Sequence, residues 1–164
     1  MNIRKALGGV AATAGAAALL LTGTTATAHA AGGPGGGVWR LQNAQTGRCL
    51  DANGTGGVYT SSCSTTAASQ RWEYHVVNGK IQLKNTSSAR CLKPTTPFSL
   101  VLETRPCDID ANDLWDEVFV SGKLRLISPG GNALDSDAKG KAYLNQYGPD
   151  NPYQQWYLTT SIPG

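Results

Sequence analysis

Hydrophobic and polar residues alternate with a period near two in three short segments of the chain: 38–41, 80–83 and 123–127. Alternation of this kind is typical of β-strands that bury one face. Turn-favouring residues follow each segment, at 45–47, 85–88 and 128–131. After residue 30, no stretch of ten residues shows the period of an amphipathic helix. The pattern therefore predicts an all-β chain of short strands.

Hydrophobic landmarks recur about every 42 residues, which divides the chain into repeats of about 38–78, 79–122 and 123–161. The landmarks are Leu41, Leu83 and Leu126; Leu50, Leu92 and Leu134; and Trp72, Trp115 and Trp156. A period of this length is typical of repeat architectures. Three such units can close into one barrel capped by hairpins, which leaves no exposed sheet edge. A three-bladed propeller has the same unit size, but it has fewer blades than propellers usually have.

The first 30 residues are typical of a secretory signal peptide. Arg4 and Lys5 precede an apolar stretch, and Ala28-His29-Ala30 provides a cleavage site. The alternative is a membrane anchor, but threonines interrupt the apolar stretch before it reaches the roughly 20 residues needed to span a bilayer. We expect a secreted protein with a Gly-rich linker at 31–37 and one domain at 38–164, and no membrane partner.

Export changes how the cysteines are interpreted. An even number of cysteines in an oxidising compartment indicates disulfides, and four cysteines allow three pairings. The repeats favour two local bridges, Cys49–Cys63 and Cys91–Cys107. A zinc site is the alternative, but the chain has no C-x-x-C pair and His75 is its one histidine after residue 30. We expect no metal and no cofactor.

Charge and composition argue against two other classes of function. Without residues 1–30, the chain has 12 basic and 11 acidic residues, so no basic patch for nucleic acid is expected. Catalytic motifs are few: a lone histidine, no G-x-S-x-G, and carboxylate pairs at 108/110 and 116/117 without an insertion that would form a cleft. We therefore do not expect an enzyme.

Short motifs stand in phase with the repeat. They are Arg48-Cys49-Leu50-Asp51 with Gln70-Arg71-Trp72, Arg90-Cys91-Leu92 with Asp113-Leu114-Trp115, and Ala133-Leu134-Asp135 with Gln154-Gln155-Trp156. This set resembles the ricin-type β-trefoil lectin family over nearly all of the chain after residue 37. The resemblance implies a β-trefoil that binds carbohydrate, with the tryptophan of each Q-x-W motif in the core.

In that family, an aspartate after Cys-Leu accepts hydrogen bonds from sugar hydroxyls, an aromatic side chain stacks on the sugar ring, and an asparagine precedes Q-x-W. Repeat three is the most complete by this pattern. It has Asp135, Tyr147 at the aromatic position with Asn145 on the same strand face, and Gln154, while Tyr153 replaces the asparagine.

The other two repeats match less well. Repeat one keeps Asp51, with Ser61 at the aromatic position, Tyr59 nearby and Ser69 in place of the asparagine. Repeat two has Lys93 and Arg105 at the carboxylate and aromatic positions, so we expect it to be structural.

Two alternatives remain open. Asp51 and Asp135 are also typical of turn carboxylates that accept backbone N–H groups. The trefoil shape also serves protein-binding and proteinase-inhibitor modules, in which loops carry the function. The Pro-rich loop 93–98, with Phe98, suits that alternative. Our expectation is a monomeric, secreted lectin for galactose-type or xylan-type glycans, acting mainly through repeat three.

Overall fold

The computed structural model describes residues 35–109 and 112–160. Over these residues the chain is all-β, as the alternation predicted. The strands are β1 (Val38–Asn43), β2 (Cys49–Ala52), β3 (Val58–Ser61), β4 (Trp72–Val77), β5 (Lys80–Asn85), β6 (Arg90–Pro94), β7 (Leu102–Pro106), β8 (Asp116–Val120), β9 (Lys123–Ile127), β10 (Asn132–Ser136), β11 (Ala142–Gln146) and β12 (Trp156–Thr160). Two short 3-10 helices, η1 (Ala68–Gln70) and η2 (Pro152–Gln154), precede β4 and β12. The predicted signal peptide (1–30) and residues 31–34 of the predicted linker lie outside the described residues.

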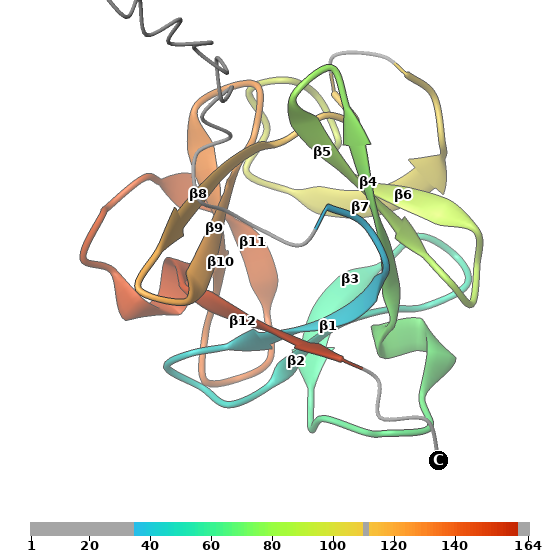
Figure 1. Ribbon diagram of the computed structural model, residues 1–164, viewed down its shortest axis with the longest axis horizontal. Helices are drawn as coiled ribbons and strands as arrows, with labels where there is room; N and C mark the ends of the chain where they lie inside the picture. Colours follow the sequence, from blue (N-terminus) through green and yellow to red (C-terminus); the bar gives the residue numbers. More distant parts are fainter. Residues whose placement is uncertain (1–34, 110–111, 161–164) are drawn as a thin grey trace, which may run out of the picture.

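The first and fourth strands of each repeat form a closed barrel. β1 pairs with β4 and β12, β4 pairs with β5, and β9 pairs with β8 and β12. Two backbone hydrogen bonds of 2.8 Å between Ile81 and Trp115 connect β5 with the start of β8 and complete the ring. Figure 1 shows the resulting arrangement of three lobes around a centre.

The second and third strands of each repeat form hairpins that cap the barrel: β2 with β3, β6 with β7, and β10 with β11. The three hairpins and the barrel together form a β-trefoil of three similar repeats. The periodic landmarks therefore predicted both the number of repeats and the way in which they close.

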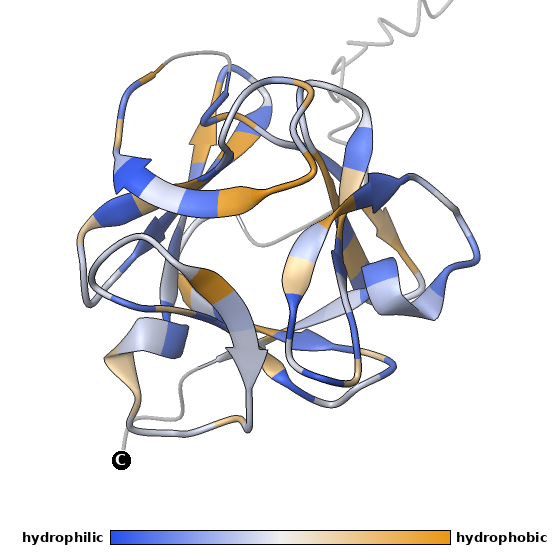
Figure 2. Ribbon diagram, turned by 180° about the vertical axis from the view of Figure 1, so that it is seen from behind, coloured by the Kyte–Doolittle hydropathy of each residue, from blue (hydrophilic) through white to orange (hydrophobic). Residues whose placement is uncertain are grey.

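The core is built from the residues that recur in the sequence. Trp72, Trp115 and Trp156 are fully buried. Each indole N–H donates a hydrogen bond of 3.0–3.1 Å to the carbonyl oxygen of the leucine that follows the Cys or Ala of its repeat. A buried indole needs such a partner, because its N–H is costly to leave unpaired. Figure 2 shows hydrophobic colour along strands near the centre and hydrophilic colour on many of the outer loops.

Both expected disulfides are present. Cys49 is bonded to Cys63 and Cys91 to Cys107, so each bridge closes one repeat onto itself. The third repeat has Ala133, which is fully buried, at the equivalent of the first cysteine.

Candidate functional site

The cap hairpins place equivalent side chains in register in all three repeats. The residue after Cys-Leu or Ala-Leu lies on β2, β6 or β10 and faces a partner on the next strand. These pairs are Asp51 with Tyr59, Lys93 with Glu103, and Asp135 with Tyr143. The residue two before each tryptophan also contacts this position. Gln70 and Gln154 donate hydrogen bonds to Asp51 and Asp135, and Asp113 pairs with Lys93.

Repeat three holds a buried carboxylate in a ring of amides. Asp135 is 1% exposed. Its Oδ2 accepts hydrogen bonds from the side-chain amides of Asn145 (3.3 Å), Asn151 (3.3 Å) and Gln154 (3.0 Å). Its Oδ1 is buried and makes no hydrogen bond to the described residues. The amides therefore fix the orientation of the carboxylate and leave one acceptor oxygen for another partner.

Aromatic side chains flank this carboxylate. Tyr143 and Tyr153 line a cavity of about 280 Å³ together with Asp135, Asn145 and Asn151. Burial raises the pKa of the Tyr143 phenol. The negative charges of Asp135 and Asp137, and the polar contact of the phenol with Asp135, raise that pKa further. The phenol therefore stays a neutral hydrogen-bond donor at physiological pH. A flat ring beside a carboxylate suits the apolar face and the hydroxyl edge of a sugar.

The structure redistributes the residues expected for repeat three. Asp135, Asn145, Tyr153 and Gln154 come together, whereas Tyr147 follows the end of β11 and is not among the residues that line the cavity. The pairing register of β10 with β11 places Tyr143 opposite Asp135 instead. The sequence comparison counted the aromatic position back from the second cysteine of a repeat. Repeat three has no such cysteine. In the structure, Asn145 is the counterpart of Ser61 and Arg105, so the choice of Tyr147 was two residues too far along the strand.

Asn151 was missed by the sequence comparison, which placed the asparagine directly before Q-x-W. Its side-chain oxygen accepts a hydrogen bond from the backbone N–H of Tyr153 (3.0 Å) at the start of η2, while its amide donates to Asp135. Asn151 thus joins the turn to the site. The dipeptide Asn151-Pro152 is the available signal, because Asn caps helical turns and Pro favours their first position.

Repeat one has the same carboxylate with fewer amides. Asp51 is 5% exposed, and its Oδ2 accepts hydrogen bonds from Ser61 Oγ (2.6 Å) and Gln70 Nε2 (3.1 Å). Its Oδ1 makes no hydrogen bond to the described residues, as in repeat three. Tyr59, at the position of Tyr143, is 37% exposed. The position of Asn151 is taken by Ala67, which has no side-chain amide to offer.

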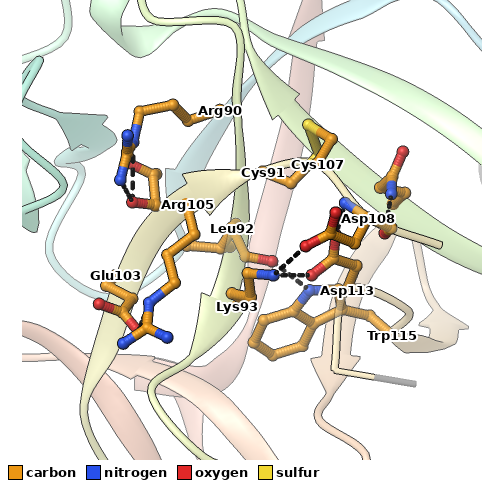
Figure 3. A network of polar contacts seen from close by, with 12 residues as sticks. Arg90, Cys91, Leu92, Lys93, Glu103, Arg105, Cys107, Asp108, Asp113 and Trp115 are labelled. Atoms are coloured by element: carbon orange, nitrogen blue, oxygen red, sulfur yellow. Dashed lines mark hydrogen bonds and ion pairs between the residues drawn. A yellow bond between two sulfur atoms is a disulfide. The ribbon is translucent and has the colours of Figure 1, made fainter. Parts of the chain in front are cut away.

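Repeat two replaces the carboxylate and amide by an ion pair. Lys93 Nζ lies 2.7 Å from Asp113 Oδ1 and 3.6 Å from Asp108 Oδ2. Figure 3 shows the lysine amine directed at these two aspartates. The Lys93 and Asp113 side chains are only 7% and 0% exposed. Glu103 and Arg105 form a second ion pair. They stand at the positions of Tyr143 and Asn145 in repeat three. The polar groups of this repeat thus satisfy one another, which fits the structural role expected for it.

The sequence as a whole matches one family of domains. The model described as "Ricin-type beta-trefoil lectin domain" matches residues 37–156. The chain belongs to the ricin-type β-trefoil lectin family. Carbohydrate binding without catalysis is the general function of this family. Comparison with curated proteins gives no match.

Solved structures share the trefoil. The designed threefold-symmetric protein ThreeFoil is 22% identical (TM-score 0.67), with 75% of this chain and 98% of that chain covered. SeviL, solved with an asialo-GM1 saccharide, is 17% identical (TM-score 0.63), with coverage of 77% and 98%. The hemolytic lectin CEL-III is 19% identical (TM-score 0.65), with 75% of this chain matching 30% of that chain. At these identities the similarity establishes the fold of this ricin-type domain.

Three further observations within residues 35–109 and 112–160 concern metal ions, the histidine and membranes. No group of three or more His, Cys, Asp or Glu side chains there is arranged to hold a metal ion. His75 is exposed on β4 and pairs with Glu73 at 3.1 Å. In the same residues, no helix has the length and apolar character needed to cross a membrane.

Proposed function

We propose that this ricin-type domain is a secreted, monomeric lectin without catalytic activity, and that it binds a galactose-type or xylan-type sugar mainly through repeat three. The observation that carries the proposal is the Asp135 carboxylate. It is buried and oriented by three amides through Oδ2, and its Oδ1 makes no hydrogen bond to the described residues. Burying a polar atom without a partner is costly, so this arrangement favours a ligand that donates a hydrogen bond.

Sugar hydroxyls are suitable donors for that oxygen. A hydrogen bond to a charged acceptor contributes about 1.5–3 kcal/mol. Tyr143 and Tyr153 provide aromatic surface beside the carboxylate for the C–H face of the ring. Since the cavity of repeat three is small, we expect a dissociation constant near the millimolar range, or about 4 kcal/mol.

Repeat three is favoured over repeat one because of its amides. Asn145 and Asn151 each have one amide proton directed at Asp135 and a second that remains for a ligand. Repeat one has Ser61 and Ala67 at those positions. A sugar in repeat one would therefore find fewer donors around its carboxylate.

The test is binding of the purified protein to a glycan and polysaccharide array, followed by titration calorimetry with the sugars that bind. The variants are Asp135→Asn and the matched change Asp51→Asn. The side-chain amide of asparagine has one accepting oxygen, whereas the carboxylate has two. We therefore expect Asp135→Asn to weaken binding at least tenfold. The fold should be retained, because the asparagine oxygen can still accept from the amides of Asn145, Asn151 and Gln154. Asp51→Asn should have a smaller effect.

Several outcomes would contradict the proposal. Loss of binding with Asp51→Asn alone would move the site to repeat one. A folded protein that binds no sugar would refute the lectin assignment. It would turn attention to protein partners of the 93–98 loop, where Phe98 is 81% exposed.

A second pair of variants tests the position of the stacking ring. Tyr143 lines the cavity and Tyr147 does not. We expect Tyr143→Ala to weaken sugar binding about tenfold, because it removes one aromatic contact and the apolar area that this contact buries. Tyr147→Ala is the matched control and should leave affinity within about twofold.

A further inference from the structure

A second cavity, of about 460 Å³, lies where β3, β7 and β11 begin. Its walls are largely aliphatic. They include Val58, Leu100, Val101, Leu102, Ala142 and Leu144. In Figure 2 the start of β7 and the loop before it carry hydrophobic colour. Leu100 is 53% exposed and Val101 is 60% exposed, so part of this wall faces solvent.

The cavity arises where the threefold pattern of the cap breaks. One backbone N–H of each third strand donates to a carbonyl oxygen in the neighbouring repeat. These bonds run from Thr60 to Gly140 (2.7 Å), from Thr104 to Gly56 (2.8 Å) and from Leu144 to Leu100 (2.9 Å). At the two glycines φ is positive, and a Cβ would lie 2.9–3.1 Å from a backbone oxygen. Repeat two has Leu100 at that position, which brings a large side chain to this junction.

The loop that carries these side chains is held in place. Thr95 N–H donates to Val101 O (3.0 Å), and Ser99 Oγ accepts from Val101 N–H (2.9 Å). Leu144 N–H is bonded to the same loop at Leu100. The aliphatic side chains are therefore presented at the surface by a hydrogen-bonded turn. Exposed apolar groups in a fixed arrangement can bind a ligand with little loss of conformational entropy.

The apolar cavity adjoins the sugar site of repeat three. Tyr143 and Asn145 line both cavities. A group attached to a sugar in the first cavity can therefore pass over this shared edge into the second. The charged group at the rim is Lys141, whose Nζ lies 5.4 Å from the centre of the Tyr143 ring, so a cationic substituent is disfavoured there.

We propose that the natural ligand is a glycoside with an uncharged, apolar aglycone, and that Leu100 and Val101 bind this aglycone while repeat three binds the sugar. The inference rests on the proposed function, because it needs a sugar beside Asp135. An aglycone gains by leaving water for an aliphatic surface, an effect roughly proportional to the apolar area that it buries.

The test compares glycosides that differ only in the aglycone. The probes are methyl and phenyl β-galactoside, and methyl and phenyl β-xyloside, measured by titration calorimetry. For the sugar that binds, we expect the phenyl glycoside to bind about tenfold more tightly than the methyl glycoside, as burial of part of a phenyl ring predicts.

The variant Val101→Thr replaces a methyl group by a hydroxyl at nearly constant volume. It should reduce the advantage of the phenyl glycoside at least threefold and leave the affinity for the methyl glycoside unchanged. Val120→Thr, at an exposed site on β8, is the matched control and should change neither affinity. Leu100→Ser is a second variant that keeps the backbone bond to Leu144, and it should also reduce the advantage.

The results separate this inference from the proposed function. If the methyl glycoside binds and the phenyl glycoside binds equally well, the aglycone proposal is overturned and the sugar site stands. The same holds if the phenyl advantage survives both Val101→Thr and Leu100→Ser in folded protein. If no methyl or phenyl glycoside binds, the sugar site itself fails for these sugars and the aglycone proposal fails with it.

Discussion

The ion pair of Lys93 with Asp113 is expected to stabilise the fold, although it lies where the other repeats have the carboxylate and amide of a sugar site. The perturbation is Lys93→Met, which removes the charge and keeps the length of the side chain. Asp113 then remains fully buried without its nearest cation. We expect the free energy of unfolding to fall by about 3 kcal/mol.

The magnitude follows from the burial and the distance of the pair. At 2.7 Å, and with an effective dielectric constant of about 20, two unit charges attract each other by about 6 kcal/mol. Desolvation of both groups offsets much of that attraction, because the side chains are only 7% and 0% exposed. Removing one partner leaves the desolvation cost of the other, which typically amounts to about 3–5 kcal/mol for a buried pair.

The assay is urea unfolding followed by tryptophan fluorescence, since three tryptophans are fully buried. Lys80→Met is the matched control. Lys80 also pairs with an aspartate, Asp116, but the two side chains are 41% and 54% exposed. An exposed pair contributes about 0–1 kcal/mol, so this control should lose little stability.

A double variant tests whether the polar pair of repeat one can replace the ion pair of repeat two. Lys93→Asp with Asp113→Gln recreates the pair that Asp51 and Gln70 form in repeat one. Asp108 N–H donates to Asp113 at 2.7 Å, and Ser64 N–H donates to Gln70 at 2.8 Å, so the glutamine can accept the same backbone bond. We expect the double variant to recover most of the stability. If Lys93→Met costs no more than Lys80→Met, the pair does not stabilise the fold and the reasoning is refuted.

Three further changes have expected outcomes. Replacing Cys91 and Cys107 together by Ala opens a loop of 16 residues and should cost about 3 kcal/mol in urea unfolding; an unchanged midpoint would contradict this. Burial, and then the hydrogen bond and charge of Glu117, raise the pKa of Tyr74 above its usual 10.0. The unfolded chain therefore loses this proton at a lower pH than the folded protein, and the free energy of unfolding falls as the pH rises above about 10. Tyr74→Phe should therefore show a smaller drop in melting temperature between about pH 9 and pH 11 than the parent, and an equal drop would contradict the assignment. Gly140→Ala places a Cβ 2.9 Å from a backbone oxygen at φ +97° and should cost about 2 kcal/mol in thermal or urea unfolding; a loss under about 0.5 kcal/mol would show that the cap adjusts freely.

Features with a strict period were predictable from the sequence. The spacing of Trp72, Trp115 and Trp156 predicted a shared core, and all three are fully buried. The local disulfides followed from the same repeat. The tryptophans recur in all three units and the cysteine pairs in two of them, so these features followed directly from the period.

Details of the site were harder to predict because they depend on strand register. The comparison of repeats selected Tyr147, whereas pairing of β10 with β11 places Tyr143 opposite Asp135. Tyr143 and Tyr147 are four residues apart. Any even shift keeps a side chain on the same face of a strand, so alternation could not distinguish the two tyrosines. Asn151 contributes through a turn, where no period applies.

The ion pair of repeat two shows a signal that could have been used. The sequence comparison noted Lys93 at the carboxylate position but treated the repeat only as one that had lost its site. Asp113 stands at the glutamine position of the same repeat. Lys93 and Asp113 replace the acid and the amide that contact each other in the other repeats. Because a lone buried charge is costly, such a paired replacement predicts an ion pair between them.

The pairing of β1 with β12 has a consequence for how this domain can be joined to others. Trp39 lies opposite Thr160, so the two ends of the barrel are neighbours. At the equivalent points of the ring, tight turns with positive φ at Asn78-Gly79 and Ser121-Gly122 connect β4 to β5 and β8 to β9. β1 and β12 thus meet where a third such turn would stand. We expect a gene rearranged to begin at Gly79 or Gly122, with Thr160 linked to Val38, to encode the same barrel. For the same reason, the domain is suited to insertion into another protein through these two neighbouring strands.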